Sequence, residues 1–136
     1  MAKESTPFKY ERILLIDDND IDNFINERMI TTSSFGRNVT VRNSAEKALD
    51  YLREIAGNTD ALPQVIFLDL DMPVMDGFGF LEQYESFDNG LKNFCKIIVL
   101  SSSISPEDIN RASTNPYVQK YLNKPLAQKY LDAIDF

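Results

Sequence analysis

The 136-residue sequence contains no histidine and a single cysteine, Cys95. Without histidine the chain cannot build a Ser-His-Asp or Cys-His catalytic centre, a histidine-ligated metal site or a phosphohistidine of its own. A single cysteine forms no disulfide within the chain, which favours a reducing compartment, and we expect a cytoplasmic protein. Because Cys95 adjoins the apolar run at residues 97–100, it is interpreted as a small buried residue rather than a nucleophile.

Membrane-spanning runs and signal-peptide features are also missing. No apolar run approaches the roughly 20 residues that cross a bilayer, and residues 1–12 mix charge with Pro7 and lack an apolar core. We therefore expect no membrane association. The net charge of −7 argues against direct nucleic-acid binding, which requires a basic face. Hydrophobic residues make up 43% of the chain, enough for the core of one globular domain.

Five short apolar segments predict β-strands. The run that begins at Val65 is continuous and rich in β-branched and aromatic residues, which is typical of a strand buried on both faces of a parallel sheet. It ends in Asp69, and the Pro and Gly residues that follow up to Gly77 predict a loop. The other predicted strands cover residues 12–16, 38–42, 96–100 and 117–123.

The segments between these strands have the apolar spacing of helices. The first predicted helix carries the apolar residues Ile21, Phe24, Ile25 and Met29, with Asp22, Asn23, Asn26 and Glu27 between them. The second runs from Ala45 to about Ala56, after a capping serine at Ser44, and its predicted buried face is Ala45, Ala48, Leu49 and Leu52. The others are predicted from Gly77 to about Asp88, from Ser105 to Asn115 and from Leu126 to Phe136.

Strand–helix alternation, repeated five times, predicts a doubly wound parallel sheet with helices on both faces. For five strands we expect the flavodoxin-like order 2-1-3-4-5, with residues 1–10 as an N-terminal tail and residues 11–136 as one domain. In this order strands one and three are neighbours. Their carboxyl ends bring Asp17 and Asp18 next to Asp69.

A cluster of three carboxylates favours a bound cation, because like charges in one place repel each other. Oxygen ligands without histidine or thiolate favour Mg²⁺, with Mn²⁺ as an alternative. The hydroxyl of Ser101 and the ammonium of Lys124 end strands four and five at the same edge. A metal, a lysine and a hydroxyl around a carboxylate suit phosphoryl transfer, with Asp69 as the nucleophile.

The ordered set of motifs resembles the receiver domain of two-component response regulators, a CheY-like fold. The resemblance runs from about Arg12 to the C-terminus. It rests on Asp17-Asp18, on Asp69-Leu70-Asp71-Met72-Pro73-Val74-Met75-Asp76-Gly77, on Ser101 and on Lys124-Pro125. It implies that Asp69 accepts a phosphoryl group from a phosphohistidine of a sensor histidine kinase or a phosphotransfer protein. It also implies a signalling domain that catalyses only its own phosphotransfer and slow autodephosphorylation, and so is not an enzyme.

The resemblance also implies a role for each acid. Asp18 and Asp69 bind Mg²⁺ through their carboxylates, Asp17 acts mainly through water, and the main-chain carbonyl of Asp71 is a further ligand. Lys124 pairs with the acids and then with the phosphoryl oxygens.

Two further residues are implied to form the conformational switch. Ser101, which stands where threonine is more frequent, bonds the phosphoryl group and moves toward it, and the ring of Tyr121 turns inward on activation. Asp71 and Ser103 occupy variable positions near the phosphoryl group. We hypothesise that these two residues tune the lifetime of the aspartyl phosphate. Unchanged dephosphorylation rates in both Asp71→Asn and Ser103→Ala would refute this hypothesis.

The resemblance also bears on partners. The fourth helix, the last strand and the last helix form the face on which receivers commonly dock a downstream partner or dimerise on phosphorylation. Here this face includes Tyr117, Lys120 and Tyr121. After Lys124 there is room only for the last helix, so we expect a stand-alone single-domain regulator.

Two other functions remain open from the sequence. Phe67-Leu68-Asp69-Leu70-Asp71 resembles the nucleophile motif of haloacid-dehalogenase-like phosphohydrolases, but Asp17-Asp18 precedes it and Met72-Pro73 replaces the expected residue. A degenerate receiver that binds partners without phosphorylation is the other alternative. An EF-hand beginning at Asp18 is excluded, because Asn23 and Met29 stand where glycine and glutamate are required.

Overall fold

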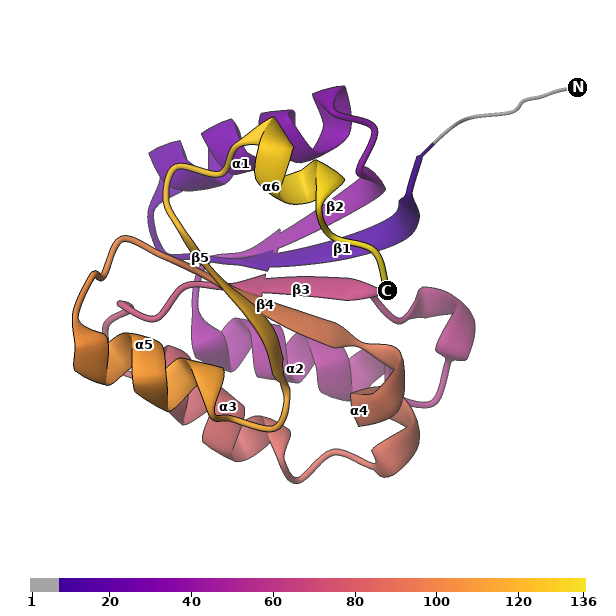
Figure 1. Ribbon diagram of the computed structural model, residues 1–136. Coiled ribbons are helices and arrows are strands. Elements are labelled where there is room, and N and C mark those ends of the chain that lie inside the picture. Colours follow the sequence, from indigo (N-terminus) through magenta and orange to yellow (C-terminus); the bar gives the residue numbers. More distant parts are fainter. Residues whose placement is uncertain (1–7) are drawn as a thin grey trace, which may run out of the picture.

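Five parallel strands form the centre of the molecule (Figure 1). The computed structural model describes residues 8–136, and its strand order is β2-β1-β3-β4-β5, as the alternation of the sequence predicts. The predicted N-terminal tail lies mostly outside the described residues. The strands are β1 (Tyr10–Ile16), β2 (Gly36–Arg42), β3 (Val65–Leu68), β4 (Lys96–Ser101) and β5 (Val118–Asn123).

Helices cover both faces of this sheet (Figure 1). On one face lie α1 (Asp20–Thr32) and α6 (Gln128–Asp132). The opposite face is covered by α2 (Ala45–Ile55), α3 (Gly77–Tyr84), α4 (Asn89–Phe94) and α5 (Pro106–Ser113). A short 3-10 helix, Thr59–Ala61, lies in the connection before β3.

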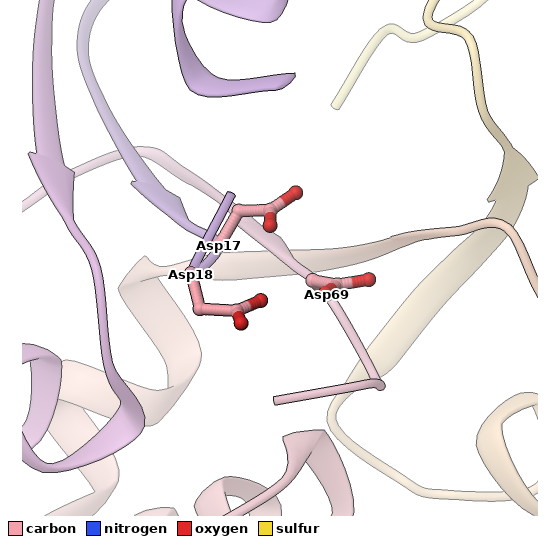
Figure 2. Close-up of side chains that lie close together, drawn as sticks. All are labelled: Asp17, Asp18 and Asp69. Atoms are coloured by element: carbon pink, nitrogen blue, oxygen red, sulfur yellow. The ribbon is translucent and has the colours of Figure 1, made fainter. Parts of the chain in front are cut away.

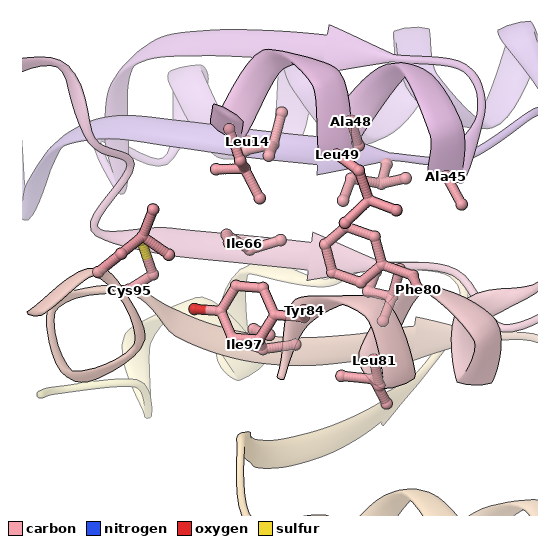
Figure 3. Close-up of a cluster of buried hydrophobic side chains, with 14 of the residues drawn as sticks. Leu14, Ala45, Ala48, Leu49, Ile66, Phe80, Leu81, Tyr84, Cys95 and Ile97 are labelled. Carbon is pink, nitrogen blue, oxygen red and sulfur yellow. The ribbon is translucent and has the colours of Figure 1, made fainter. Parts of the chain in front are cut away.

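Alternate residues of the central strands supply two hydrophobic cores. In β1, Leu14 and Ile16 face the core under α2 and α3, whereas Ile13 and Leu15 face the core under α1 and α6. Burial on both faces explains the continuous apolar runs. Figure 3 shows the first core, in which Leu49 of α2 lies beside Phe80, while the buried Cys95 lies at the opposite end of the cluster.

The prediction for the apolar face of α1 was wrong. Ile21, Phe24 and Ile25 are 70%, 63% and 48% exposed, whereas Asn23 and Asn26 are buried. The buried amide of Asn23 donates a hydrogen bond to the main-chain carbonyl of Asp17 (2.8 Å), which turns the polar side of the first turn toward the end of β1. Apolar periodicity shows which residues share a face, but not which way that face is turned.

Several element boundaries differ from the prediction. β1 begins at Tyr10 and β2 at Gly36. Gly36 pairs with Tyr10 in β1, and the close approach favours glycine, because a Cβ there would lie 2.3 Å from the Cγ1 of Ile13. The helix α4 was not predicted, because Asp88-Asn89-Gly90 has the composition of a turn; Asp88 instead caps the helix by accepting a hydrogen bond from the Leu91 amide (2.9 Å).

The last helix is shorter than predicted. It covers Gln128–Asp132 instead of residues 126–136, and Ala127 offers no side-chain cap. Leu126 and Ile134 are nevertheless buried on either side of it. The apolar spacing therefore identified the packed residues correctly, although the backbone around them is only partly helical.

Candidate functional site

Three aspartates meet at the carboxyl ends of β1 and β3. The two strands pair with Ile16 opposite Leu68, so the residues that follow each strand leave the sheet side by side. Figure 2 shows Asp17 and Asp18 beyond β1 next to Asp69. One carboxylate oxygen from each lies within 4.8 Å of the others; Asp17 and Asp69 are buried and Asp18 is exposed.

Lys124 brings a positive charge to these acids from the loop after β5. Its ammonium nitrogen, Nζ, lies 2.6 Å from Asp17 Oδ2, 2.9 Å from Asp22 Oδ2 and 3.5 Å from Asp69 Oδ1. The main-chain N–H of Lys124 donates to the carbonyl of Ser101 (2.9 Å), which joins the loop to the end of β4. The lysine therefore neutralises part of the charge of the cluster.

Asp22 is a member of this site that the sequence reasoning missed. In the sequence it is one of the polar residues between the apolar positions of the first predicted helix. The available signal was its place in the first turn of a helix that begins directly after Asp17-Asp18. A carboxylate there is at the same edge of the sheet as Lys124.

The electrostatics of Asp69 differ from those of an ordinary aspartate. Burial, together with repulsion from Asp17, raises the pKa of its carboxyl from 3.8 to about 7, and attraction by Lys124 only partly opposes this. Asp69 Oδ1 is buried and accepts no hydrogen bond from the described residues. The ionised carboxylate is therefore only partly compensated, by Lys124 at 3.5 Å, and favours an added positive charge.

The pKa of Lys124 is also raised, but for a base this favours the charged form. Burial disfavours its charged form, but hydrogen bonds to Asp17 and Asp22 outweigh this effect and raise the pKa of the ammonium above its usual value. The lysine remains a cation at every pH in the physiological range. It supplies a permanent positive charge beside Asp69.

The donor set fits a hard divalent cation. All the groups that meet at the cluster are carboxylates, and one oxygen of Asp69 is without a hydrogen-bond partner. Asp71 follows in the loop with an exposed side chain, and its charge contributes slightly to the raised pKa of Asp69. The loop returns closely onto β3: a side chain at Gly77 would lie 2.6 Å from the Asp69 carbonyl oxygen.

Ser101 and Tyr121 are connected through the loop that follows β4. Ser101 is fully buried, and its Oγ accepts a hydrogen bond from the Ser103 N–H (3.1 Å). The hydroxyl of Tyr121 donates to the Ser103 carbonyl (2.8 Å). The Ser103 hydroxyl in turn donates to Asp108 in α5 (2.8 Å). One short loop thus links the predicted switch residues to the start of α5.

Comparisons with known proteins agree on one family. A sequence model described as the response regulator receiver domain matches residues 13–134. The probable methanogenesis regulatory protein FilR2 of Methanothrix harundinacea is 33% identical over 115 residues, which cover 85% of this chain and 72% of FilR2. The sensory/regulatory protein RpfC of Xanthomonas campestris is 32% identical over 124 residues, 90% of this chain but only 16% of RpfC.

Solved structures support the same assignment. The two-component response regulator from Cytophaga hutchinsonii superposes with a TM-score of 0.84 at 30% sequence identity, over 91% of this chain and 92% of that one. As for the membrane, none of the helices within residues 8–136 is long and apolar enough to cross one.

Proposed function

The chain belongs to the response regulator receiver family of two-component signalling, and from this premise we propose that Asp69 is its phosphoacceptor. The observation that carries the proposal is the setting of Asp69: a buried carboxylate with one oxygen free of hydrogen bonds, between Asp17 and Lys124. Asp69 also lies at the carboxyl edge of the sheet, which is where ligands reach open parallel sheets.

The proposed reaction is phosphoryl transfer from a phosphohistidine. A carboxylate oxygen of Asp69 attacks phosphorus, the new P–O bond forms as the P–N bond breaks, and the imidazole of the donor leaves with the electron pair. Lys124 stabilises the charge on the phosphoryl oxygens, since its ammonium is already 3.5 Å from Asp69 Oδ1. The domain performs its own phosphotransfer and slow autodephosphorylation and turns over no other substrate.

The acid cluster is proposed to hold Mg²⁺, with Mn²⁺ as an alternative. Asp18 and Asp69 would bind through carboxylates, Asp17 mainly through water, and Asp71 through its main-chain carbonyl. When bound, the cation offsets the repulsion among the acids and the charge on the transferring group. Without it, the charge of Asp17 disfavours the ionised form of Asp69.

The switch is proposed to work through the loop after β4. Ser101 would turn its hydroxyl toward the phosphoryl group, which requires release of the hydrogen bond from the Ser103 N–H. Because Tyr121 is bonded to the carbonyl of Ser103, a shift of this loop moves the tyrosine as well. The output is a population shift between two packings of β5 and α5, biased by bonds to the phosphoryl group. Asp71 and Ser103 remain proposed tuners of its lifetime.

The phosphoryl donor is proposed to be a sensor histidine kinase or a phosphotransfer protein that docks on α1. Ile21, Phe24 and Ile25 expose an apolar face on the helix that starts two residues after Asp18. Exposed apolar residues beside a reactive group are typical of a contact surface. Downstream, we propose that a partner or a second copy docks on the face of α5, β5 and α6, which includes Tyr117, Lys120 and Tyr121.

Labelling with acetyl phosphate and Mg²⁺ tests the proposed function. We expect one phosphoryl group per chain in the wild type, loss of labelling in Asp69→Ala, and no labelling when Mg²⁺ is chelated. Asp60→Asn removes an exposed acid in the loop before β3 and should leave labelling unchanged. Equal labelling of wild type and Asp69→Ala would refute the assignment.

The same experiment separates the alternatives. A receiver that only binds partners would show no labelling at all. Repeated turnover of a generic phosphate ester would indicate the phosphohydrolase. The receiver family model covers residues 13–134, so the ordered set of motifs is that of a receiver domain. We therefore do not propose phosphohydrolase activity for this chain.

A further inference from the structure

Lys124 is held by an acid that lies outside the carboxylate cluster. Asp22, in the first turn of α1, places its Oδ2 2.9 Å from Lys124 Nζ. The position of this residue is set by the helix cap, because the side chain of Asn19 accepts a hydrogen bond from the Asp22 N–H (2.9 Å). Asp22 is not one of the acids grouped closely enough to share a cation, which are Asp17, Asp18 and Asp69.

The distances show how the lysine is shared. Its ammonium makes hydrogen bonds to Asp17 (2.6 Å) and Asp22 (2.9 Å), and Asp69 is the most distant of its three acidic partners at 3.5 Å. The lysine side chain is 14% exposed and that of Asp17 is 2% exposed, whereas Asp22 is 37% exposed, so water competes mainly for the contact with Asp22. Two acids therefore hold the ammonium on the side of β1 and α1, just beyond hydrogen-bond distance from Asp69.

We propose that Asp22 is a positioning residue that restrains Lys124 in the resting state and thereby slows phosphorylation of Asp69. This inference rests on the proposed function of Asp69. Asp22 acts through the lysine: it touches neither the phosphoryl group nor the predicted metal ligands.

The physical reason is that Lys124 makes different contacts in the resting state and in the transition state of phosphorylation. The phosphoryl group requires the ammonium of Lys124, and a bond that is stronger before the reaction than after it raises the barrier. The hydrogen bond to Asp22 is complete in the resting state, so it must weaken when the lysine turns to the phosphoryl oxygens. Its loss should free Lys124 for the transition state.

The test compares Asp22→Ala with Asp20→Ala. Both variants remove one acid from the first turn of α1, but Asp20 is exposed and makes no contact with Lys124. With acetyl phosphate and Mg²⁺ we expect Asp22→Ala to be labelled roughly three- to tenfold faster than wild type, the factor for one ordinary hydrogen bond, because Asp22 is partly exposed to water. Asp20→Ala should stay within about twofold, as expected for an exposed charge.

Three further variants separate positioning from a structural role. Asp22→Glu retains a carboxylate within reach of Lys124 and should return the rate toward that of wild type. In a Lys124→Gln background, Asp22→Ala should no longer accelerate labelling. Asp22→Asn keeps the shape of the side chain, so it should also be labelled faster than wild type and can replace the alanine variant if that variant folds poorly. Crystal structures of Asp22→Ala and Asp22→Asn should show Lys124 Nζ within hydrogen-bond distance of Asp69.

Each outcome decides the inference. Unchanged or slower labelling of both Asp22→Ala and Asp22→Asn, or an equal acceleration by Asp20→Ala, overturns it. Persistence of the acceleration in the Lys124→Gln background also overturns it, because the effect would not pass through the lysine. Absence of labelling in the wild type is a different result: it refutes the proposed function itself.

Discussion

At the scale of single residues, the site is defined by how Asp69 is compensated. Asp17 and Lys124 act on it in opposite directions, and burial strengthens both effects. The lysine is divided among three acids, so none of them is fully neutralised. The electrostatic energy of the site is therefore unfavourable when neither a cation nor a phosphoryl group is bound. For this reason the site can respond to the binding of each.

The raised pKa of Asp69 predicts a stability effect in metal-free protein. A folded-state pKa of about 7 against 3.8 means that stability falls as pH rises between these values and is lowest above pH 7. Asp69→Asn removes this penalty, so at pH 8 with EDTA we expect it to be more stable by a few kcal/mol, about 4 kcal/mol at most. Thermal unfolding checks this. The gain should shrink at pH 4 and with saturating Mg²⁺; an equal gain at pH 4 would contradict the account.

Tyr121 gives a second prediction at this scale. Tyr121→Phe removes the hydrogen bond to the Ser103 carbonyl but keeps the ring, so we expect a loss of about 1 kcal/mol in unfolding free energy. Urea unfolding measures it. Tyr130→Phe is the matched control, because no hydrogen bond joins the Tyr130 hydroxyl to any residue the structure describes. Equal effects of the two substitutions would show that the bond to the loop is unimportant.

At the scale of elements, the loops after the strands place the functional groups, and close backbone packing fixes the loops. The clearest case is the connection from β3 to α3. The main-chain N–H of Gly77 donates to the carbonyl of Leu70 (3.0 Å), and the backbone of Asp69 and Leu70 occupies the space that a Cβ at Gly77 would need. This contact determines where Asp69 leaves the strand.

Gly77→Ala tests that contact. The added methyl group would lie 2.6 Å from the Asp69 carbonyl oxygen and 2.8 Å from the Leu70 Cα, and backbone atoms cannot move aside cheaply. We expect a loss of about 1–3 kcal/mol in unfolding free energy and slower labelling of Asp69 by acetyl phosphate. Gly57→Ala, where nothing lies within 4 Å of the added atom, should change neither property. A fully stable and active Gly77→Ala would refute the role of this contact.

The exposed side of α1 gives the next prediction. Phe24→Ser should slow phosphotransfer from a cognate kinase or phosphotransfer protein roughly tenfold, since exposed aromatic anchors carry much of the energy of a contact. It should leave labelling by acetyl phosphate unchanged. Phe136→Ser is the control: its ring is also exposed but lies near Tyr10, at the other end of β1. Equal losses with both donors would place the defect in the site and not in docking.

At the scale of the whole molecule, the sequence predicted topology better than orientation. The repeated strand–helix alternation was enough to predict the order of the strands, and the order placed Asp17 and Asp69 at the same edge of the sheet. The side of α1 that faces the sheet was not predictable from periodicity, because the buried contact is made by the amide of Asn23. Asp22 was missed for the same reason: its role depends on the rotation of α1.

The most direct test of the central claim is mass-spectrometric mapping of the phosphorylated residue. The chain is phosphorylated with acetyl phosphate and Mg²⁺, and the peptide that carries the additional phosphoryl group is sequenced. We expect one group, on Asp69, in the peptide that contains the end of β3. A group on Asp17, Asp18 or any other residue of wild-type protein would contradict it.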